Sequence, residues 1–158
     1  MKIDFIDDNA KQLVLFDMDG VLAEYVAGEE RAIIDEVKGV YLNKRPMKSI
    51  INIAEDLNKR NNITIGILSS CEYPSQVIEK KEWLKKYASF IAEENIHIIV
   101  WCDDDYARET RRFAKLDKLK NIMCDYDKVF LIEDTHENIK AINNEIPNVA
   151  HHISELIE

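Results

Sequence analysis

Short apolar runs alternate with longer amphipathic segments along most of this chain. Five runs rich in Val, Ile and Leu predict strands. The first four are almost continuously hydrophobic, which is typical of strands covered on both faces, as in a parallel sheet. The predicted strands are 12–16, 63–68, 96–101, 128–132 and the weaker 148–151.

The segments between these runs carry apolar residues at helical spacing. In the segment 46–60, Ile50, Ile53, Ala54 and Leu57 form one stripe. Similar patterns predict helices over 74–90, which starts with a proline, over 114–124 and over 135–146, which a proline follows. Alternation of strand and helix predicts an α/β fold, with a doubly wound, mostly parallel five-stranded sheet and right-handed crossovers.

Residues 22–45 do not fit this alternation. They separate the first strand from the helix that should return from it, and they contain a short helical candidate over 29–37, with Gly28 and Gly39 as candidate joints. Two interpretations stay open: a small cap insertion beside the mouth of a site, or a long loop with one surface helix. The chain has no internal repeats and no Pro/Gly/Ser-rich linker, so we expect residues 1–158 to form a single domain.

Composition narrows the choice of partners and compartment. The net charge of −9 argues against a broad surface for nucleic-acid backbones but permits a small anionic substrate at a local positive site. Three cysteines without a C-x-x-C pair predict free thiols in a reducing compartment. The sequence has neither a signal-peptide core nor an apolar run of membrane length, so we expect a cytoplasmic protein without a membrane partner. It gives no prediction of oligomeric state.

Two carboxylates directly follow the first apolar run. Asp17 and Asp19 lie two residues apart, and Gly20 permits a turn that would aim both side chains at one point beyond the sheet edge. Charged groups are costly to place at the end of a buried strand without a counter-ion, and Mg²⁺ prefers oxygen ligands. The sequence therefore predicts a magnesium site here, with an ordinary acidic turn as the alternative.

Other reactive side chains follow the other strands at the same edge. In open α/β sheets, ligands bind beyond the carboxyl ends of the strands. Ser69 and Ser70 follow the second strand, Glu133 and Asp134 follow the fourth, and Lys115 begins the helix before the fourth. A carboxylate that attacks phosphorus, cations that neutralise phosphoryl oxygens, hydroxyl donors and a second carboxylic acid together form a complete set for phosphoryl transfer.

These segments resemble the motifs of the haloacid dehalogenase (HAD) superfamily of phosphohydrolases. Residues 16–22, FDMDGVL, are similar to its first motif, an apolar strand followed by D-x-D-G-[VT]-[LI]. Residues 67–70, ILSS, resemble the second motif, residues 130–135, FLIEDT, resemble the fourth, and Lys115 is assigned to the third, which is a lone lysine. The resemblance spans about residues 12–146. A looser similarity of 41–46 and 79–84 points to small 5′-nucleotidases that act on deoxyribonucleotides.

The resemblance implies a role for each matching residue. Asp17 would be the nucleophile and a metal ligand, and Asp19 the general acid/base that binds metal through its backbone carbonyl. Asp134 would be the main remaining Mg²⁺ ligand, supported by Glu133. The phosphate-binding group would be Ser69, Ser70 and Lys115. Lys118 and Lys120 lie near Lys115 on the same charged helix, where two of the three lysines are expected to face solvent.

Three functions are consistent with these residues. The first is a Mg²⁺-dependent phosphohydrolase that cleaves a small phosphomonoester, with a (deoxy)nucleoside monophosphate as one candidate, through an aspartyl-phosphate. The second, from another class, is a phosphoacceptor signalling module of the receiver type, which normally places its acidic pair after the first strand rather than the fourth. The third is a nucleic-acid end-processing phosphatase, which a local patch of Arg108, Arg111 and Arg112 would favour although the net charge makes a nucleic-acid partner unexpected.

Overall fold

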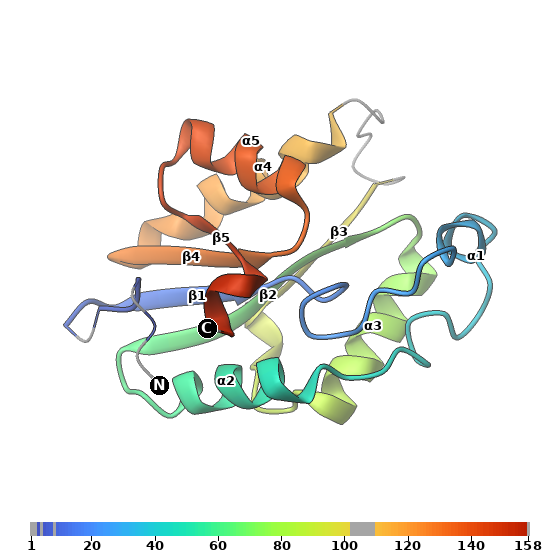
Figure 1. Ribbon diagram of the computed structural model, residues 1–158, viewed down its shortest axis with the longest axis horizontal. Coiled ribbons are helices and arrows are strands. Elements are labelled where there is room, and N and C mark those ends of the chain that lie inside the picture. Colours follow the sequence, from blue (N-terminus) through green and yellow to red (C-terminus); the bar gives the residue numbers. More distant parts are fainter. Residues whose placement is uncertain (1–2, 4, 8, 102–109, 158) are drawn as a thin grey trace.

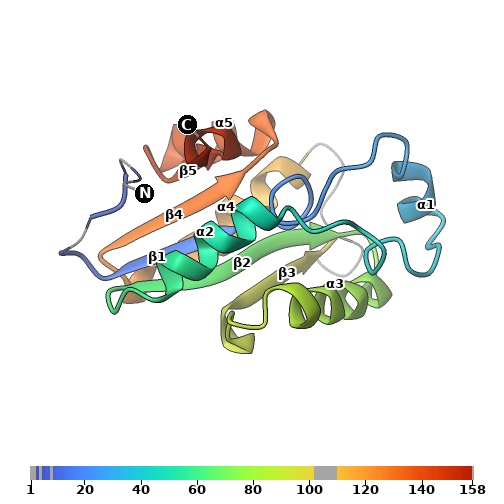
Figure 2. The same cartoon turned by 60° about the horizontal axis from the view of Figure 1, so that its bottom comes forward.

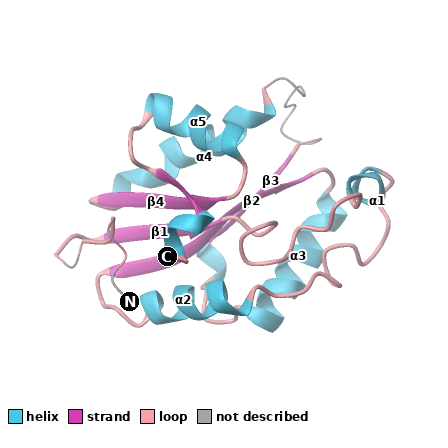
Figure 3. Ribbon diagram, in the orientation of Figure 1, coloured by secondary structure: helices cyan, strands magenta, loops and turns pink. Residues whose placement is uncertain are grey.

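Five parallel strands form the centre of the molecule, in the order β3-β2-β1-β4-β5. The computed structural model describes residues 3, 5–7, 9–101 and 110–157. The strands are β1 (Gln12–Phe16), β2 (Ile63–Cys71), β3 (Ile96–Val100), β4 (Lys128–Glu133) and β5 (Ala150–His152), and they cross the middle of Figures 1 and 3. The predicted α/β class and parallel five-stranded sheet are confirmed.

Helices cover both faces of this sheet. The pair α2 (Lys48–Asn58) and α3 (Pro74–Tyr87) lies on one face, and the pair α4 (Arg111–Ile122) and α5 (His136–Glu145) lies on the other (Figures 1 and 2). A short helix, α1 (Glu30–Ile34), projects from the segment 22–45, which we call the insertion. Three short 3-10 helices complete the described elements: Glu93–Asn95, Met123–Asp125 and Ile153–Leu156. None of the described helices is long and apolar enough to cross a membrane.

The alternation of side chains along β1 explains the double layer of helices. Val14 and Phe16 contribute to the cluster that contains the buried apolar residues of α2 and α3, whereas Leu13 and Leu15 contribute to the cluster with those of α4 and α5. Every residue of β1 is buried. A strand buried on both faces requires helices on both faces, which is why its sequence is continuously apolar.

The strand order brings the chemically important strand ends together. β1 pairs with β2 on one side and with β4 on the other, and Phe16 is in register with both Ile67 and Ile132. From β1 the chain adds β2 and β3 on one side of the sheet and β4 and β5 on the other. Such a reversal of direction leaves a crevice at the carboxyl ends of the strands. The residues that follow β1 and β4, and those that end β2, border this crevice.

The element boundaries differ from the predicted ones for identifiable reasons. β2 continues to Cys71 because its last residues pair with β3, so Ser69 and Ser70 lie inside the strand rather than beyond it. β5 begins only at Ala150, because Asn148 has a φ of 61° and the side chain of Asn143 accepts hydrogen bonds from the Val149 and Ala150 amides. In the insertion, Glu36 has a φ of 54° and the helix ends at Ile34, earlier than predicted.

Candidate active site

Asp17 lies immediately beyond β1 and is buried. Its backbone amide donates to the Ile132 carbonyl at 2.9 Å, which continues the pairing with β4 past the end of the strand. Its Oδ1 accepts a hydrogen bond from the Met18 amide at 2.7 Å, and its Oδ2 lies 2.7 Å from the Lys115 Nζ. Neighbouring backbone and a buried ammonium therefore fix the orientation of this carboxylate.

Lys115 is the lysine of α4 that reaches the site. It is buried, and its Nζ donates to Glu133 Oε2 at 2.5 Å in addition to pairing with Asp17. Lys118 is only partly buried, and Lys120 pairs with Glu145 on the surface at 3.4 Å. Of the three lysines of this helix, Lys115 is thus the one that contacts Asp17 and Glu133.

Three acidic side chains converge next to Lys115. Asp17, Glu133 and Asp134 each offer an oxygen, and these oxygens all lie within 4.8 Å of one another. Mg²⁺ prefers oxygen ligands, and these three carboxylates could together hold such an ion. Glu133 carries a further function, because its Oε1 accepts the amides of Asp134 and Thr135 at 3.2 and 3.1 Å and so shapes the turn after β4.

Gly20 makes this convergence sterically feasible. A Cβ at position 20 would lie 2.0 Å from Asp134 Oδ2, and the glycine has a φ of 75°, in the region that other residues rarely adopt. The missing side chain therefore lets the Asp134 carboxylate, which follows β4, approach the turn after β1. The expectation that Gly20 forms the turn holds, and its contact with Asp134 gives a second reason for glycine there.

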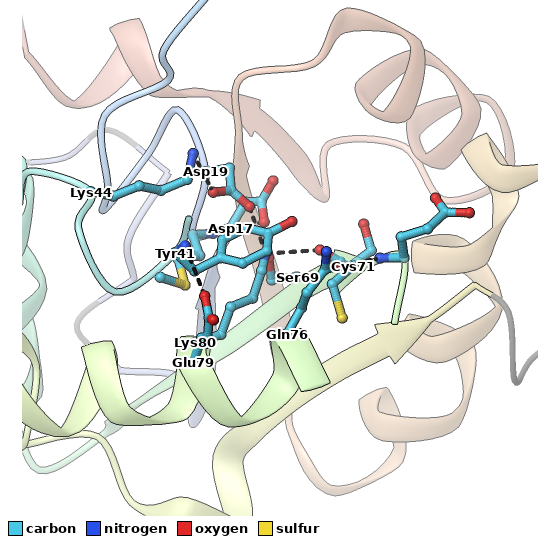
Figure 4. Close-up of polar contacts among 12 residues, drawn as sticks. Asp17, Asp19, Tyr41, Lys44, Ser69, Cys71, Gln76, Glu79 and Lys80 are labelled. Carbon is cyan, nitrogen blue, oxygen red and sulfur yellow. Dashed lines mark hydrogen bonds and ion pairs between the residues drawn. The ribbon is translucent and has the colours of Figure 1, made fainter. Parts of the chain in front are cut away.

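Asp19 is surrounded quite differently (Figure 4). Its Oδ2 accepts a hydrogen bond from Lys80 Nζ at 2.5 Å, and its Oδ1 lies 3.0 Å from Lys44 Nζ. Lys80 comes from α3 and Lys44 from the insertion, and both side chains are almost fully buried. One carboxylate thus faces two ammonium groups from separate parts of the chain.

Lys80 also connects Asp19 to the end of β2. Its Nζ donates to Ser69 Oγ at 2.9 Å and to the Ser70 carbonyl at 2.8 Å, and the Tyr41 ring lies 4.5 Å from the ammonium. An ammonium has three N–H donors, and Asp19, Ser69 and Ser70 supply three acceptors. Because the Ser69 oxygen accepts from Lys80, its own O–H remains able to donate to a ligand in the site.

These surroundings shift the pKa values of the two aspartates in opposite directions. Burial raises the pKa of Asp17 to about 6. The positive charge of Lys115 partly opposes this shift, and the negative charge of Glu133 adds to it. Burial acts in the same sense on Asp19, but Lys80 and Lys44 together outweigh it and hold the pKa of Asp19 below its usual value. The pKa of Lys115 is raised, because Asp17 and Glu133 outweigh the effect of burial on that ammonium.

A cavity of about 950 Å³ opens onto these residues. Its wall includes Asp17, Asp19, Ser69, Ser70, Lys115 and Asp134, whereas Glu133, the predicted supporting ligand, is fully buried behind it. The insertion contributes Tyr25, Glu29, Ile33 and Tyr41, and the outer wall includes Trp101, Arg111 and Arg112. The space fits a ligand considerably larger than a phosphate ion.

The arginines of the proposed basic patch are not equivalent. Arg111 forms a double contact with Glu72, at 3.0 and 2.8 Å, and lies 4.4 Å from the Trp101 ring centroid. Its charge is therefore locally balanced. Arg112 is exposed, and Arg108 lies outside the described residues.

Sequence reasoning missed Lys44 and Lys80 as parts of the site. A signal for Lys80 was nevertheless present, because the buried positions of α3 are Gln76, Lys80, Trp83 and Leu84, which follow one helical stripe. A lysine on such a stripe needs a buried partner. Lys44 carried no comparable signal, because it lies outside any regular element.

The fold is that of haloacid dehalogenase-like proteins. Among solved structures, the chain is similar to the HAD domain of the effector protein Lem4 from Legionella pneumophila (TM-score 0.55, 15% identity, 92% of this chain and 86% of that one). It is also similar to a haloacid dehalogenase-like protein from Burkholderia xenovorans LB400 (TM-score 0.54, 13% identity, 90% and 80%). The fold expected from the sequence motifs is thereby confirmed.

A third similarity is to a chain in the Pnkp1/Rnl/Hen1 RNA repair complex, found in two structures. The TM-scores are 0.67 and 0.69 at 14% and 15% identity, with 96% of this chain covered in each. This chain spans about half of that protein, 45% and 50% of its length in the two structures. Comparisons with protein-family models and with curated proteins gave no match.

Proposed function

We propose that this protein is a Mg²⁺-dependent phosphohydrolase that cleaves a small phosphomonoester through an aspartyl-phosphate. The observation that carries the proposal is the convergence of Asp17, Glu133 and Asp134, whose oxygens lie within 4.8 Å of one another beside the buried Lys115. Carboxylates at such spacing repel one another unless cations compensate them. The haloacid dehalogenase-like fold supports the same activity.

Asp17 and Asp19 would divide the reaction into two steps. In the first, a carboxylate oxygen of Asp17 attacks phosphorus, the bond from phosphorus to the leaving oxygen breaks, and Asp19 supplies that oxygen with a proton. In the second, Asp19 takes a proton from water, whose oxygen attacks the aspartyl-phosphate. Inorganic phosphate leaves, and the Asp17 carboxylate is regenerated.

The remaining residues would hold the transferring group. Lys115 neutralises charge on the phosphoryl oxygens and orients Asp17, and the Ser69 hydroxyl donates to one of those oxygens from the wall of the cavity. Ser70 lies beside it and contributes its backbone. Mg²⁺, held by Asp17, Asp134 and the Asp19 carbonyl with Glu133 in support, would supply further compensation of phosphoryl charge.

The electrostatics of Asp19 suggest which substrates react fastest. Its lowered pKa favours the ionised form, which suits proton removal from water in the second step. Proton donation in the first step is correspondingly weaker. We therefore expect phosphate esters whose leaving groups depart readily, such as aryl phosphates, to be cleaved faster than alkyl phosphates.

A panel assay tests the activity. Purified protein is incubated with p-nitrophenyl phosphate, nucleoside monophosphates and sugar phosphates, with and without Mg²⁺, and released phosphate is measured. Multiple turnover is expected only with Mg²⁺, and Asp17→Asn should lower it by at least about 10⁴-fold. A receiver-type module would take up one phosphoryl group without turning over, so a single stoichiometric phosphorylation would refute the proposal.

A nucleic-acid end-processing phosphatase is the second candidate. The similarity to a chain of an RNA repair complex favours it. The net charge of −9 and the pairing of Arg111 with Glu72 argue against it. Turnover of 3′- or 5′-phosphorylated oligonucleotides that exceeds turnover of mononucleotides, and an affinity for them that falls steeply with salt, would favour this candidate over the first.

A further inference from the structure

The two carboxylate oxygens of Asp19 have different surroundings. Oδ2 accepts a hydrogen bond from Lys80. Oδ1 is buried and, within the described part of the chain, accepts no hydrogen bond with good geometry, although the Lys44 ammonium stands 3.0 Å away. A hydrogen bond thus fixes Oδ2, whereas the only described group that holds Oδ1 is the nearby Lys44 ammonium.

Hydrogen bonds to the backbone at Lys44 and Arg45 fix the position of Lys44. Its carbonyl accepts a hydrogen bond from the indole Nε1 of Trp83, a buried residue of α3, at 2.9 Å. The backbone carbonyl of the next residue, Arg45, accepts a hydrogen bond from the Glu24 amide at 2.9 Å. The start of the lysine side chain is therefore fixed against the core rather than carried on a free loop.

The ammonium of Lys44 lies between two acidic residues. It forms an ion pair with Glu29 of the insertion on one side and contacts Asp19 on the other, and only 1% of the side chain is exposed. A buried cation with poor pairing would be strongly destabilising. Both carboxylates line the cavity, so Lys44 connects the insertion to the predicted reaction centre.

A second contact docks the same segment on α3 (Figure 4). The carboxylate of Glu79 accepts the amides of Gly39 and Tyr41 at 2.6 and 3.1 Å. Glu79 precedes Lys80, so adjacent residues of α3 bind the insertion and Asp19. The contacts that place the insertion and those that orient Asp19 therefore share one helix.

We propose that Lys44 is a positioning residue for Asp19, so that this carboxylate is correctly oriented only while the insertion is docked on α3. The proposal rests on the function proposed above and assigns to the insertion a part in the chemistry besides covering the cavity. Lys44 acts through Asp19 and does not contact the phosphoryl group.

The test compares Lys44→Met with Arg45→Met, measured on p-nitrophenyl phosphate with saturating Mg²⁺. Arg45 is the matched control, because it is the adjacent cation, is exposed, and has only a 3.9 Å contact with Glu24. Lys44→Met should lower kcat by about 30- to 100-fold, the size expected for a misplaced reacting group, with KM changed less than about threefold. Arg45→Met should leave both unchanged.

A double-mutant cycle separates positioning from a general loss of structure. If Lys44 acts through Asp19, Lys44→Met should cause no further loss in an Asp19→Asn background. Primary alkylamines should restore part of the activity of Lys44→Ala and none of that of Asp19→Asn, because a small amine can occupy the space of the ammonium. Circular dichroism and thermal melting show whether each variant is folded, and Lys44→Gln replaces Lys44→Met if the latter is not.

Several results would overturn the proposal. Losses that multiply in the double variant, an equal loss in Arg45→Met, or folded Lys44 variants with unchanged kcat would each exclude positioning through Asp19. Failure of the proposed function gives a different result, because the unmodified protein would then hydrolyse none of the phosphomonoesters in the panel.

Discussion

Asp17 and Asp19 are the same residue type, two positions apart at the end of one strand. Their environments nevertheless shift their side-chain pKa values in opposite directions. Asp17 shares the single ammonium of Lys115 with Glu133, and its pKa is raised to about 6. Asp19 faces the ammonium groups of Lys44 and Lys80, and its pKa is lowered. Burial raises the pKa of both carboxyl groups, so the balance of nearby cations and anions decides the sign of each shift.

This difference also separates two regions of the molecule. The partners of Asp17 come from α4 and β4 of the core, whereas those of Asp19 come from α3 and the insertion. The half of the candidate site that would hold Mg²⁺ can therefore form from the sheet and its helices. The half that would handle protons depends in addition on how the insertion folds back onto α3.

Replacing Lys115 should remove the charge compensation around Asp17. Lys115→Met leaves Asp17 and Glu133 without their shared cation, and we expect turnover to fall by about 10²- to 10³-fold. The metal-free protein should lose about 3–5 kcal/mol of unfolding free energy, the cost of an uncompensated buried charge. Phosphatase assays and urea titration measure the two effects. Lys118→Met, one turn along the helix, should change stability by less than about 0.5 kcal/mol, and an equal effect there would refute the assignment.

Neutralising Asp19 should affect both activity and stability. In Asp19→Asn, turnover should fall by about 10²-fold, and at pH 7 the unfolding free energy should fall by about 1–3 kcal/mol because Lys80 and Lys44 lose a partner. A carboxyl group whose pKa is lowered on folding stabilises the folded protein at pH values above its unfolded pKa. This contribution is lost as the pH falls through the folded-state pKa. The deficit of Asp19→Asn should therefore shrink toward acid pH, as denaturation at pH 7 and pH 3 would reveal.

Asp134→Asn should weaken the metal site without removing the nucleophile. Loss of one charged ligand is expected to lower Mg²⁺ affinity by about 10- to 100-fold. Activity at limiting Mg²⁺ should drop and recover substantially as the concentration is raised, which a Mg²⁺ titration of turnover measures. Failure to recover at any Mg²⁺ concentration would indicate a role other than metal binding.

Asp17 should have the opposite effect on stability in the metal-free protein. Because its folded-state pKa lies near 6, above the ordinary value of 3.8, its favourable contribution is present below about pH 4 and is lost as the pH rises through 6. Asp17→Asn should thus be more stable than the unmodified protein at pH 7, by about 1–3 kcal/mol, with little difference at pH 4. Thermal melts with a chelator at both pH values measure this, and an unstable Asp17→Asn at pH 7 would contradict it.

The sequence predicted the parts of this site that are local. The apolar run of β1, the D-x-D-G turn and the acidic pair after β4 each depend on a few consecutive residues, and the parallel sheet brings the strand ends to one edge. Asp17, Asp134 and Lys115 could be grouped on that basis.

The partners of Asp19 could not be predicted in the same way. The contact between Lys44 and Asp19 requires an irregular segment to return to the strand from which it departed, and the indole of Trp83 fixes that return. No periodicity in residues 22–45 encodes this path. Lys80 required only closer attention to a charged residue on the buried stripe of α3.

Gly20 carries a consequence for variation and for engineering. The space that a methyl group would occupy is already filled by the Asp134 carboxylate, 2.0 Å from where a Cβ would stand. Even alanine, the smallest replacement, should push the Asp134 carboxylate away from Asp17 and Glu133, so saturation mutagenesis screened for turnover should recover only glycine. The most restrictive position of the pocket would then be one that contributes no side chain at all.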